Sequence, residues 1–116
     1  MSMLQTKNQT QTFKEENMSD LMFVYGTLVS NVMRQAVLNH PVEAQKDSLR
    51  NYVKTPHTYF DVYPTIKKEQ GGTVEGVVFP INWQDKACLD RYETEHYKRI
   101  KVKLESGKVA FAYIEA

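Results

Sequence analysis

The run Leu21-Met22-Phe23-Val24-Tyr25 limits what this chain can fold into more than any other part of the sequence. Its consecutive apolar and aromatic residues leave no polar face, so they predict a strand that is buried on both faces and organises the core. Gly26 follows directly and predicts a sharp turn that exposes backbone N–H groups no longer used by the sheet. Such N–H groups can bind an anion, although a purely structural turn is the commoner meaning of Gly-Thr at the end of a strand.

Two short helices are predicted downstream of this strand. Apolar residues at near-helical spacing indicate the first helix over residues 31–39, and the step His40-Pro41 ends it. The second helix is predicted over residues 83–92, with Asn82 as its N-cap and Asp85 at the third helical position.

Most of the remaining pattern is typical of strands. Residues 57–63 alternate and are rich in β-forming side chains, and a turn at Gly71-Gly72 is predicted to lead into a strand over residues 73–81. Residues 42–53 are weakly patterned and fit one or two strands.

A hairpin is predicted at the C-terminal end, where residues 97–104 and 109–114 are joined through Ser106-Gly107. The resulting order is a strand, a helix, several strands, a helix and a hairpin. It predicts an α+β fold with two short helices and a mostly antiparallel, partly closed, β-barrel-like sheet.

The length of 116 residues fits one globular domain. Residues 1–20 are mostly polar and show no sustained period, so they predict a flexible tail, and the domain is expected over residues 21–116. With 15 basic and 14 acidic side chains there is no basic field for nucleic acid. The single cysteine, the absence of a secretory-signal pattern and the lack of an apolar run near the ~20 residues of a membrane helix predict a soluble, cytoplasmic protein.

Three carboxylates, Asp90, Glu93 and Glu95, cluster at the predicted C-terminal end of the second helix. Carboxylates at that end oppose the helix dipole at ~0.3–1 kcal/mol each, which suggests that at least one of them serves something other than helix stability. The alternative is a solvated acidic end that neighbouring basic residues partly neutralise.

Two short motifs, separated by sixty-odd residues, carry a resemblance. Tyr25-Gly26-Thr27-Leu28 follows the first strand, and Leu89-Asp90-Arg91-Tyr92-Glu93 lies on the second helix. In this order they are similar to the Tyr-Gly-Thr/Ser-Leu loop and the Leu-Asp-x-Tyr/Phe-Glu segment of the γ-glutamyl cyclotransferase-like family. Weaker matches extend the resemblance over about residues 21–116: Tyr63-Pro64, the strand Val74-Glu75-Gly76-Val77-Val78-Phe79, Tyr97-Lys98-Arg99 and Ala112-Tyr113-Ile114.

The resemblance implies an enzyme that converts a γ-glutamyl amine or peptide to 5-oxoproline and a free amine. Glu93 would be the general acid and base, and the backbone amides of Gly26-Thr27-Leu28 would hold the glutamyl carboxylate or the oxyanion. Tyr25 and Tyr113 would line the cavity, although each fits a simple core aromatic equally well. The partner is thus a small-molecule γ-glutamyl substrate, with no nucleic acid and no membrane. Since the three histidines do not stand at metal-ligand spacings, no metal or other cofactor is expected.

Two residues depart from the family's pattern, since Asn31 and Thr94 stand where glycines are usual. Asn tolerates a left-handed backbone, but a β-branched Thr does not, so the backbone after Glu93 is expected to differ and with it the substrate class. A further concern is Arg99, because an ion pair with Glu93 would lower the pKa of that carboxyl and work against its role as a base.

Two other hypotheses remain open. One is a noncatalytic module of the same fold that binds a small carboxylate but has lost turnover. The other is an oligomerisation scaffold, which requires Glu93 in bulk solvent with no adjoining cavity. The oligomeric state and the identity of the leaving amine are not specified by these patterns.

Overall fold

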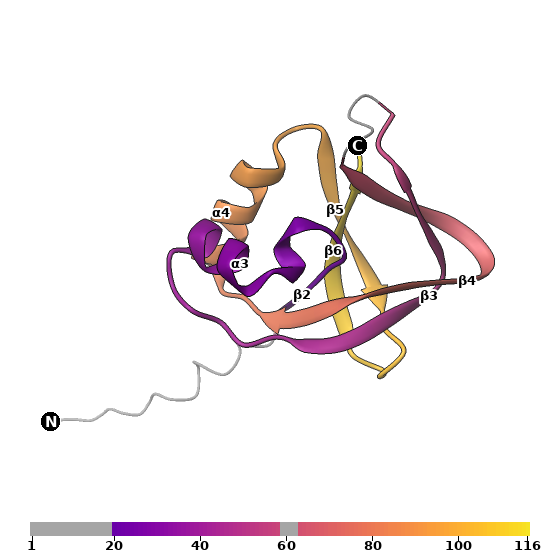
Figure 1. Cartoon of the computed structure of the whole chain (residues 1–116), viewed down its shortest axis with the longest axis horizontal. Coiled ribbons are helices and arrows are strands. Elements are labelled where there is room, and N and C mark those ends of the chain that lie inside the picture. Colours follow the sequence, from indigo (N-terminus) through magenta and orange to yellow (C-terminus); the bar gives the residue numbers. More distant parts are fainter. Residues whose placement is uncertain (1–19, 59–62) are drawn as a thin grey trace, which may run out of the picture.

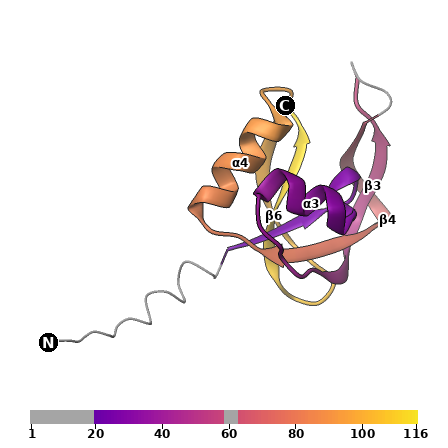
Figure 2. The same cartoon turned by 60° about the vertical axis from the view of Figure 1, so that its left-hand side comes forward.

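The computed structural model describes residues 20–58 and 63–116, so the predicted tail lies outside the described residues except for Asp20. The elements follow in the order β2 (Leu21–Val24), the 3₁₀ turn η1 (Thr27–Val29), α3 (Asn31–Leu38), β3 (Gln45–Pro56), β4 (Pro64–Pro80), α4 (Trp83–Glu93), β5 (Tyr97–Lys103) and β6 (Val109–Glu115). Figures 1 and 2 show α3 and α4 together on one side of the sheet. No helix among the described residues is both long enough and apolar enough to span a bilayer.

The predicted first strand, β2, is the centre of a five-stranded sheet with the order β3-β4-β2-β6-β5. It pairs antiparallel with β4 and parallel with β6, which it meets at Met22 and Phe111. Phe23 faces one apolar cluster, between the two halves of the sheet, and Met22 faces a second cluster beneath the helices. Both side chains are 0% exposed, which confirms a strand that is buried on both faces.

The α+β class with two short helices is confirmed, although the sheet stays open. β3 and β5 are its edges, and they do not pair with each other. The β5–β6 turn nevertheless reaches β3, since Glu105 N donates to Ser48 O at 2.8 Å and Ser106 Oγ donates to Asp47 at 2.6 Å. These contacts curl the sheet around the first cluster without closing a barrel.

The predicted turn at Gly71-Gly72 is wrong. Both glycines lie inside the long strand β4, which pairs with β3 along a single hairpin. The register of that hairpin shifts beside Asn51, and both Asn51 (φ 66°) and Gly71 (φ 86°) adopt left-handed backbones there. Asn51 Oδ1 accepts a hydrogen bond from Gly71 N at 3.0 Å, so the glycine pair serves an irregularity within the ladder.

The predicted strand over residues 57–63 is also not found where it can be checked. His57, Thr58 and Tyr63 lie outside the strands, and residues 59–62 are outside the described residues. The weakly patterned residues 42–53 instead contribute most of β3.

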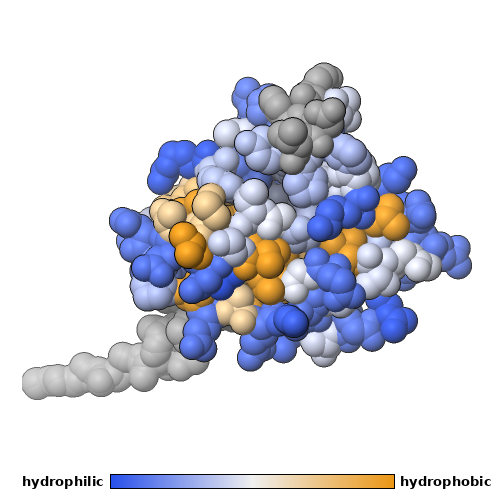
Figure 3. Space-filling model, viewed as in Figure 1, coloured by the Kyte–Doolittle hydropathy of each residue, from blue (hydrophilic) through white to orange (hydrophobic). Residues whose placement is uncertain are grey.

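Both helices and the C-terminal hairpin are confirmed, but each helix buries a charged residue beside an apolar one: Arg34 with Leu38 on α3, and Asp85 with Leu89 on α4. On α3, Arg34 is only 5% exposed whereas Val32 is 75% exposed, and Figure 3 shows apolar side chains gathered on this face of the molecule. On α4, Trp83 is 71% exposed while Asp85 is buried. Asp85 is buried because it completes a capping box with Asn82 and bonds His40 Nε2 at 2.7 Å.

Candidate active site

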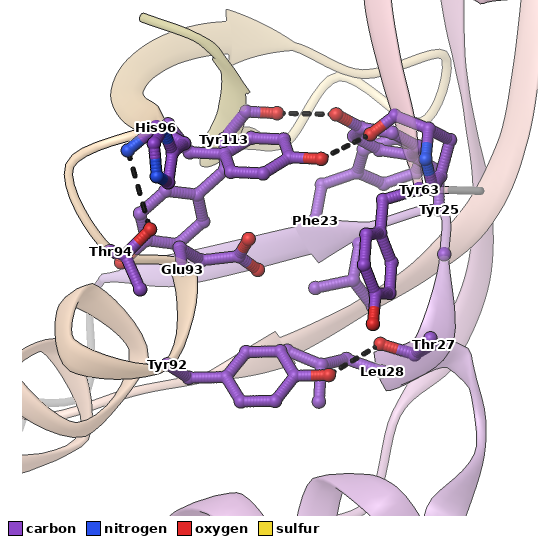
Figure 4. A pocket seen from close by; sticks show the side chains of 14 residues that line it. Phe23, Tyr25, Thr27, Leu28, Tyr63, Tyr92, Glu93, Thr94, His96 and Tyr113 are labelled. Carbon is purple, nitrogen blue, oxygen red and sulfur yellow. Dashed lines mark hydrogen bonds between the residues drawn. The ribbon is translucent and has the colours of Figure 1, made fainter. Parts of the chain in front are cut away.

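A cavity of about 280 Å³ opens between the end of β2, the end of α4 and strands β5 and β6 (Figure 4). Its volume lies near the lower end of the range for small-molecule sites, about 300–1,000 Å³. The lining residues are Phe23, Val24, Tyr25, Gly26, Thr27, Leu28, Tyr63, Pro64, Tyr92, Glu93, Thr94, His96, Tyr97 and Tyr113. All the residues predicted from sequence to form a site therefore line one cavity.

The loop after β2 lines this cavity with Gly26, Thr27 and Leu28. Its carbonyls are occupied, since Val29 N donates to Gly26 O at 3.1 Å and Ser30 N donates to Thr27 O at 3.2 Å. Thr27 and Leu28 begin the turn, and among the described residues their N–H groups donate to no backbone carbonyl. Two N–H groups of this loop are thus left without a backbone acceptor among the described residues.

Gly26 is required by the approach of another segment rather than by a left-handed backbone. Its φ is −127°, and a Cβ atom at this position would lie 3.1 Å from Cγ of Pro64. The contact brings the start of β4 against the loop, so Pro64 closes one wall of the cavity.

Glu93 is the last residue of α4, and Figure 4 shows its carboxylate pointing into the cavity. Burial raises the pKa of this carboxyl to about 7. No cation among the described residues forms an ion pair with it. A carboxyl with such a pKa can both accept and return a proton near neutral pH.

Arg99 and Glu93 do not form the ion pair that would have lowered the pKa of the Glu93 carboxyl. Arg99 instead binds Asp90 with two hydrogen bonds, from Nε at 3.0 Å and from Nη2 at 3.2 Å. Asp90 is three residues before Glu93 on α4, and its side chain is 47% exposed. The guanidinium is therefore held away from the carboxylate that faces the cavity.

Thr94 adopts the backbone conformation that its side chain should disfavour. Its φ of 66° and ψ of −173° belong to a region that is essentially reserved for glycine. Thr94 ends α4 and lines the cavity, and its Oγ1 accepts a hydrogen bond from His96 N at 3.3 Å. The chain thus turns sharply after Glu93 in spite of the branched Cβ.

Tyr25 and Tyr113 are at once core residues and cavity walls. The Tyr25 hydroxyl donates to the carbonyl of Tyr113 at 2.5 Å, and the Tyr113 hydroxyl donates to Asp90 at 2.5 Å. Burial raises the pKa of both hydroxyls far above the usual tyrosine value. Both rings are consequently fixed in place, and neither hydroxyl is suited to give up its proton.

Sequence reasoning assigned no role to several other aromatic residues of the cavity. The hydroxyls of Tyr92 and Thr27 lie 2.7 Å apart, which joins α4 to the loop after β2 (Figure 4). Tyr97 donates from its hydroxyl to the carbonyl of Pro64 at 2.9 Å. Both tyrosines belong to the motifs that resemble the family, so the motifs could have marked them as site residues. The sequence does not show, however, that they bond Thr27 and Pro64.

The cavity has a distinctive charge pattern. Glu93 is its acidic side chain, and no lysine or arginine appears among its lining residues within the described part of the chain. In the same described ranges, no group of three or more His, Cys, Asp or Glu side chains is placed to hold a metal ion.

Comparisons with known proteins agree with this geometry. Residues 22–116 match the family model described as "Gamma-glutamyl cyclotransferase, AIG2-like". No curated protein matches the chain.

Several solved structures share the fold. A solution structure from Arabidopsis thaliana has a TM-score of 0.71 at 20% identity, covering 83% of this chain and 61% of that one. A structure described as a gamma-glutamyl cyclotransferase has a TM-score of 0.67 at 19% identity, covering 84% and 66%. An uncharacterised protein from Pyrococcus horikoshii has a TM-score of 0.63 at 20% identity, covering 83% and 77%. The chain thus spans less than two thirds of the first of these proteins.

Proposed function

Because the chain belongs to the gamma-glutamyl cyclotransferase, AIG2-like family, we propose that it is a cyclotransferase that converts a γ-glutamyl amine or peptide to 5-oxoproline and a free amine. In this proposal Glu93 is the general acid and base. The N–H groups of Thr27 and Leu28 hold the glutamyl carboxylate or the oxyanion.

The observation that carries the proposal is the meeting of Glu93 and the loop after β2 in one cavity. A carboxyl buried enough to have a pKa of about 7 is matched to proton transfer near neutral pH. Free N–H groups on the loop side complement the negative charge that the substrate carries or develops. The cavity is also too small for a macromolecular segment and suits a small metabolite.

The reaction is an intramolecular acyl transfer. The α-amino nitrogen of the glutamyl group attacks its own γ-carbonyl carbon, forming the ring C–N bond, and the bond from that carbon to the leaving nitrogen breaks. Glu93 accepts the proton from the attacking nitrogen and returns it to the leaving nitrogen. Holding the folded conformer supplies up to ~7–11 kcal/mol in favourable intramolecular cases, so the fixed aromatic walls contribute by orienting the substrate.

The lining also favours certain leaving amines. Tyr63, Tyr92 and Tyr97 present aromatic rings to the cavity, and its lining includes no lysine or arginine within the described residues. A leaving amine with its own carboxylate would find no lysine or arginine among the described lining residues, whereas an uncharged or cationic amine can pack on the rings. We therefore propose amines without a carboxylate as the preferred leaving groups.

The test is an assay of the purified protein with γ-glutamyl amines and γ-glutamyl dipeptides, with 5-oxoproline measured by mass spectrometry. Glu93→Gln is expected to lower turnover by about 10²–10⁴-fold, because it removes the proton-transfer group. Glu95→Gln is the matched control, since it removes the same charge at an exposed position two residues away. Undiminished turnover in Glu93→Gln would contradict the assignment.

Binding of 5-oxoproline without turnover of any γ-glutamyl compound would instead support the noncatalytic carboxylate-binding module. The scaffold hypothesis required Glu93 in bulk solvent, and the buried carboxylate in a cavity does not fit it. A cytoplasmic location remains a prediction, and localisation of a tagged protein tests it.

A further inference from the structure

Arg34 is a buried cation, and the described part of the chain gives it no carboxylate partner. It is 5% exposed, and none of the ion pairs among the described residues includes it. Its guanidinium lies over the ring of Phe79, and its Nε has no hydrogen-bond partner. Removing such a charge from water is costly, so the contacts that it makes instead require an explanation.

Those contacts are to the loop after β2. Arg34 Nη1 donates to Leu28 O at 3.2 Å and to Val29 O at 2.9 Å, and Nη2 donates to Asn31 Oδ1 at 3.1 Å. The cation therefore faces the carbonyl side of the loop whose N–H groups the cavity uses.

The hydrogen bonds form two chains that run from Arg34 to the cavity. In the first, Arg34 binds Leu28 O, the N–H of the same peptide unit (Val29 N) donates to Gly26 O, and that unit ends in the free N–H of Thr27. In the second, Arg34 binds Val29 O, the N–H of that unit (Ser30 N) donates to Thr27 O, and that unit ends in the free N–H of Leu28. Each chain crosses two peptide groups.

We propose that Arg34 is a positioning residue that fixes and polarises the N–H groups of Thr27 and Leu28 for a substrate carboxylate or oxyanion. A cation at the carbonyl end of a hydrogen-bonded chain draws electron density toward itself, and each bond strengthens the next by perhaps 10–30%. The positive charge also acts through a poorly screened interior, yet it never enters the cavity. The inference rests on the proposed function, because that function assigns the anion site to these two N–H groups.

The test compares the binding of 5-oxoproline with that of 5-oxoprolinamide, which lacks the carboxylate. A merely structural defect weakens both ligands alike, whereas a loss of polarisation weakens 5-oxoproline more. In Arg34→Met the preference for 5-oxoproline, measured by calorimetry, is expected to fall about tenfold, the size of one weakened charge-assisted hydrogen bond. The turnover number is expected to fall with it.

Arg50→Met is the matched control, because it removes the same charge from a side chain that is 70% exposed and paired with Glu105. Its carboxylate preference is expected to equal that of the wild type. Should Arg34→Met not fold, Arg34→Lys decides: it keeps the charge but not the two-pronged donor, and its preference is expected to fall by a smaller factor, about two- to fivefold.

An unchanged preference in a folded Arg34 variant would overturn the inference, as would a wild type that binds both ligands equally. Failure of the proposed function has a different signature, namely no turnover of any γ-glutamyl compound. A protein without turnover that still prefers 5-oxoproline, and loses this preference in Arg34→Met, would retain the role of Arg34 and lose only the reaction.

Discussion

At the level of single residues, Glu93 sets the pH dependence expected of this protein. Its carboxyl has a pKa of about 7 because it is buried, so the base is formed only as the pH rises through neutrality. We expect kcat/KM to increase between about pH 6 and 8, and the ¹³C resonance of the Glu93 carboxyl to titrate with a midpoint near 7. A midpoint near the ordinary glutamate value of 4.5 would contradict both the burial and the role.

The same pKa predicts a cost in stability. Between pH 4.5 and about 7 the folded state keeps the Glu93 proton that the unfolded state has lost, so the free energy of unfolding falls as the pH rises. Glu93→Gln removes this penalty and is expected to be more stable than the wild type at pH 8, by on the order of 1–3 kcal/mol, with little difference at pH 4.5. Urea unfolding at the two pH values measures it, with Glu95→Gln as the control.

Thr94 offers a second stability test. Its φ of 66° and ψ of −173° are natural for glycine and strained for threonine, so Thr94→Gly is expected to raise the free energy of unfolding by about 1 kcal/mol. Thr94→Ala is the control, since it keeps the Cβ and its strain but loses the hydroxyl that bonds His96 N. Urea unfolding of the two variants measures the difference, and an alanine variant more stable than the glycine variant would contradict this account.

The residues of the candidate site differ in how far the sequence revealed them. Glu93 and the Gly26-Thr27-Leu28 loop carried a motif, and the structure brings them into one cavity. Arg34 was missed because one cation on a short helix carries no periodic signal, and only the loop carbonyls explain its burial. The pairing of Arg99 with Asp90 was also out of reach, because the choice between two nearby carboxylates depends on the direction in which each side chain leaves the helix.

At the level of elements, α4 matters most because it ends in Glu93. Its first turn depends on Asn82, whose Oδ1 accepts a hydrogen bond from Asp85 N at 2.8 Å. Asn82→Ala is expected to lower the free energy of unfolding by about 0.5–2 kcal/mol. Gln84→Ala, at an exposed position of the same turn, is expected to change it little, and thermal unfolding compares the two.

Periodicity located the helices but not the faces that they bury. On α3 and α4 the buried positions include two charged residues, Arg34 and Asp85. Arg34 binds the loop just before its helix, and Asp85 binds His40 as well as its own N-cap. These contacts are made by polar groups, so the spacing of apolar residues could not predict that the two charged side chains are buried. The glycines at 71–72 were wrongly predicted to form a turn. A left-handed glycine inside a long strand cannot be told from a turn glycine when the partner strand is unknown.

At the level of the whole molecule, the open sheet is held in its curled shape by contacts between its two edges. Partial burial raises the pKa of the Asp47 carboxyl, but hydrogen bonds from Ser106 and Ser48 outweigh this effect and hold the pKa below its usual value. This contribution to stability is present at neutral pH and is lost as the pH falls through the lowered pKa. A double-mutant cycle of Asp47→Ala and Ser106→Ala is expected to show a coupling of about 0.5–1.5 kcal/mol at pH 7.

That coupling should fade in urea unfolding as the pH is lowered through the depressed pKa of the Asp47 carboxyl, which lies below the usual aspartate value. A coupling that does not depend on pH would mean that the neutral hydroxyl, rather than the carboxylate, ties the two edges together. Arg50, which pairs with Glu105 across the same gap, provides a second cycle at this junction.

The central place of β2 between β4 and β6 governs how the protein emerges from the ribosome. β2 is translated before its neighbour β6, which follows the other described strands in the sequence. Until then Met22 and Phe23 lack part of their cover, and the wall supplied by Tyr113 is missing. A nascent chain therefore carries an incompletely covered apolar strand until β6 has been made, a situation in which chaperones are needed, and its cavity forms only once β6 lies beside β2.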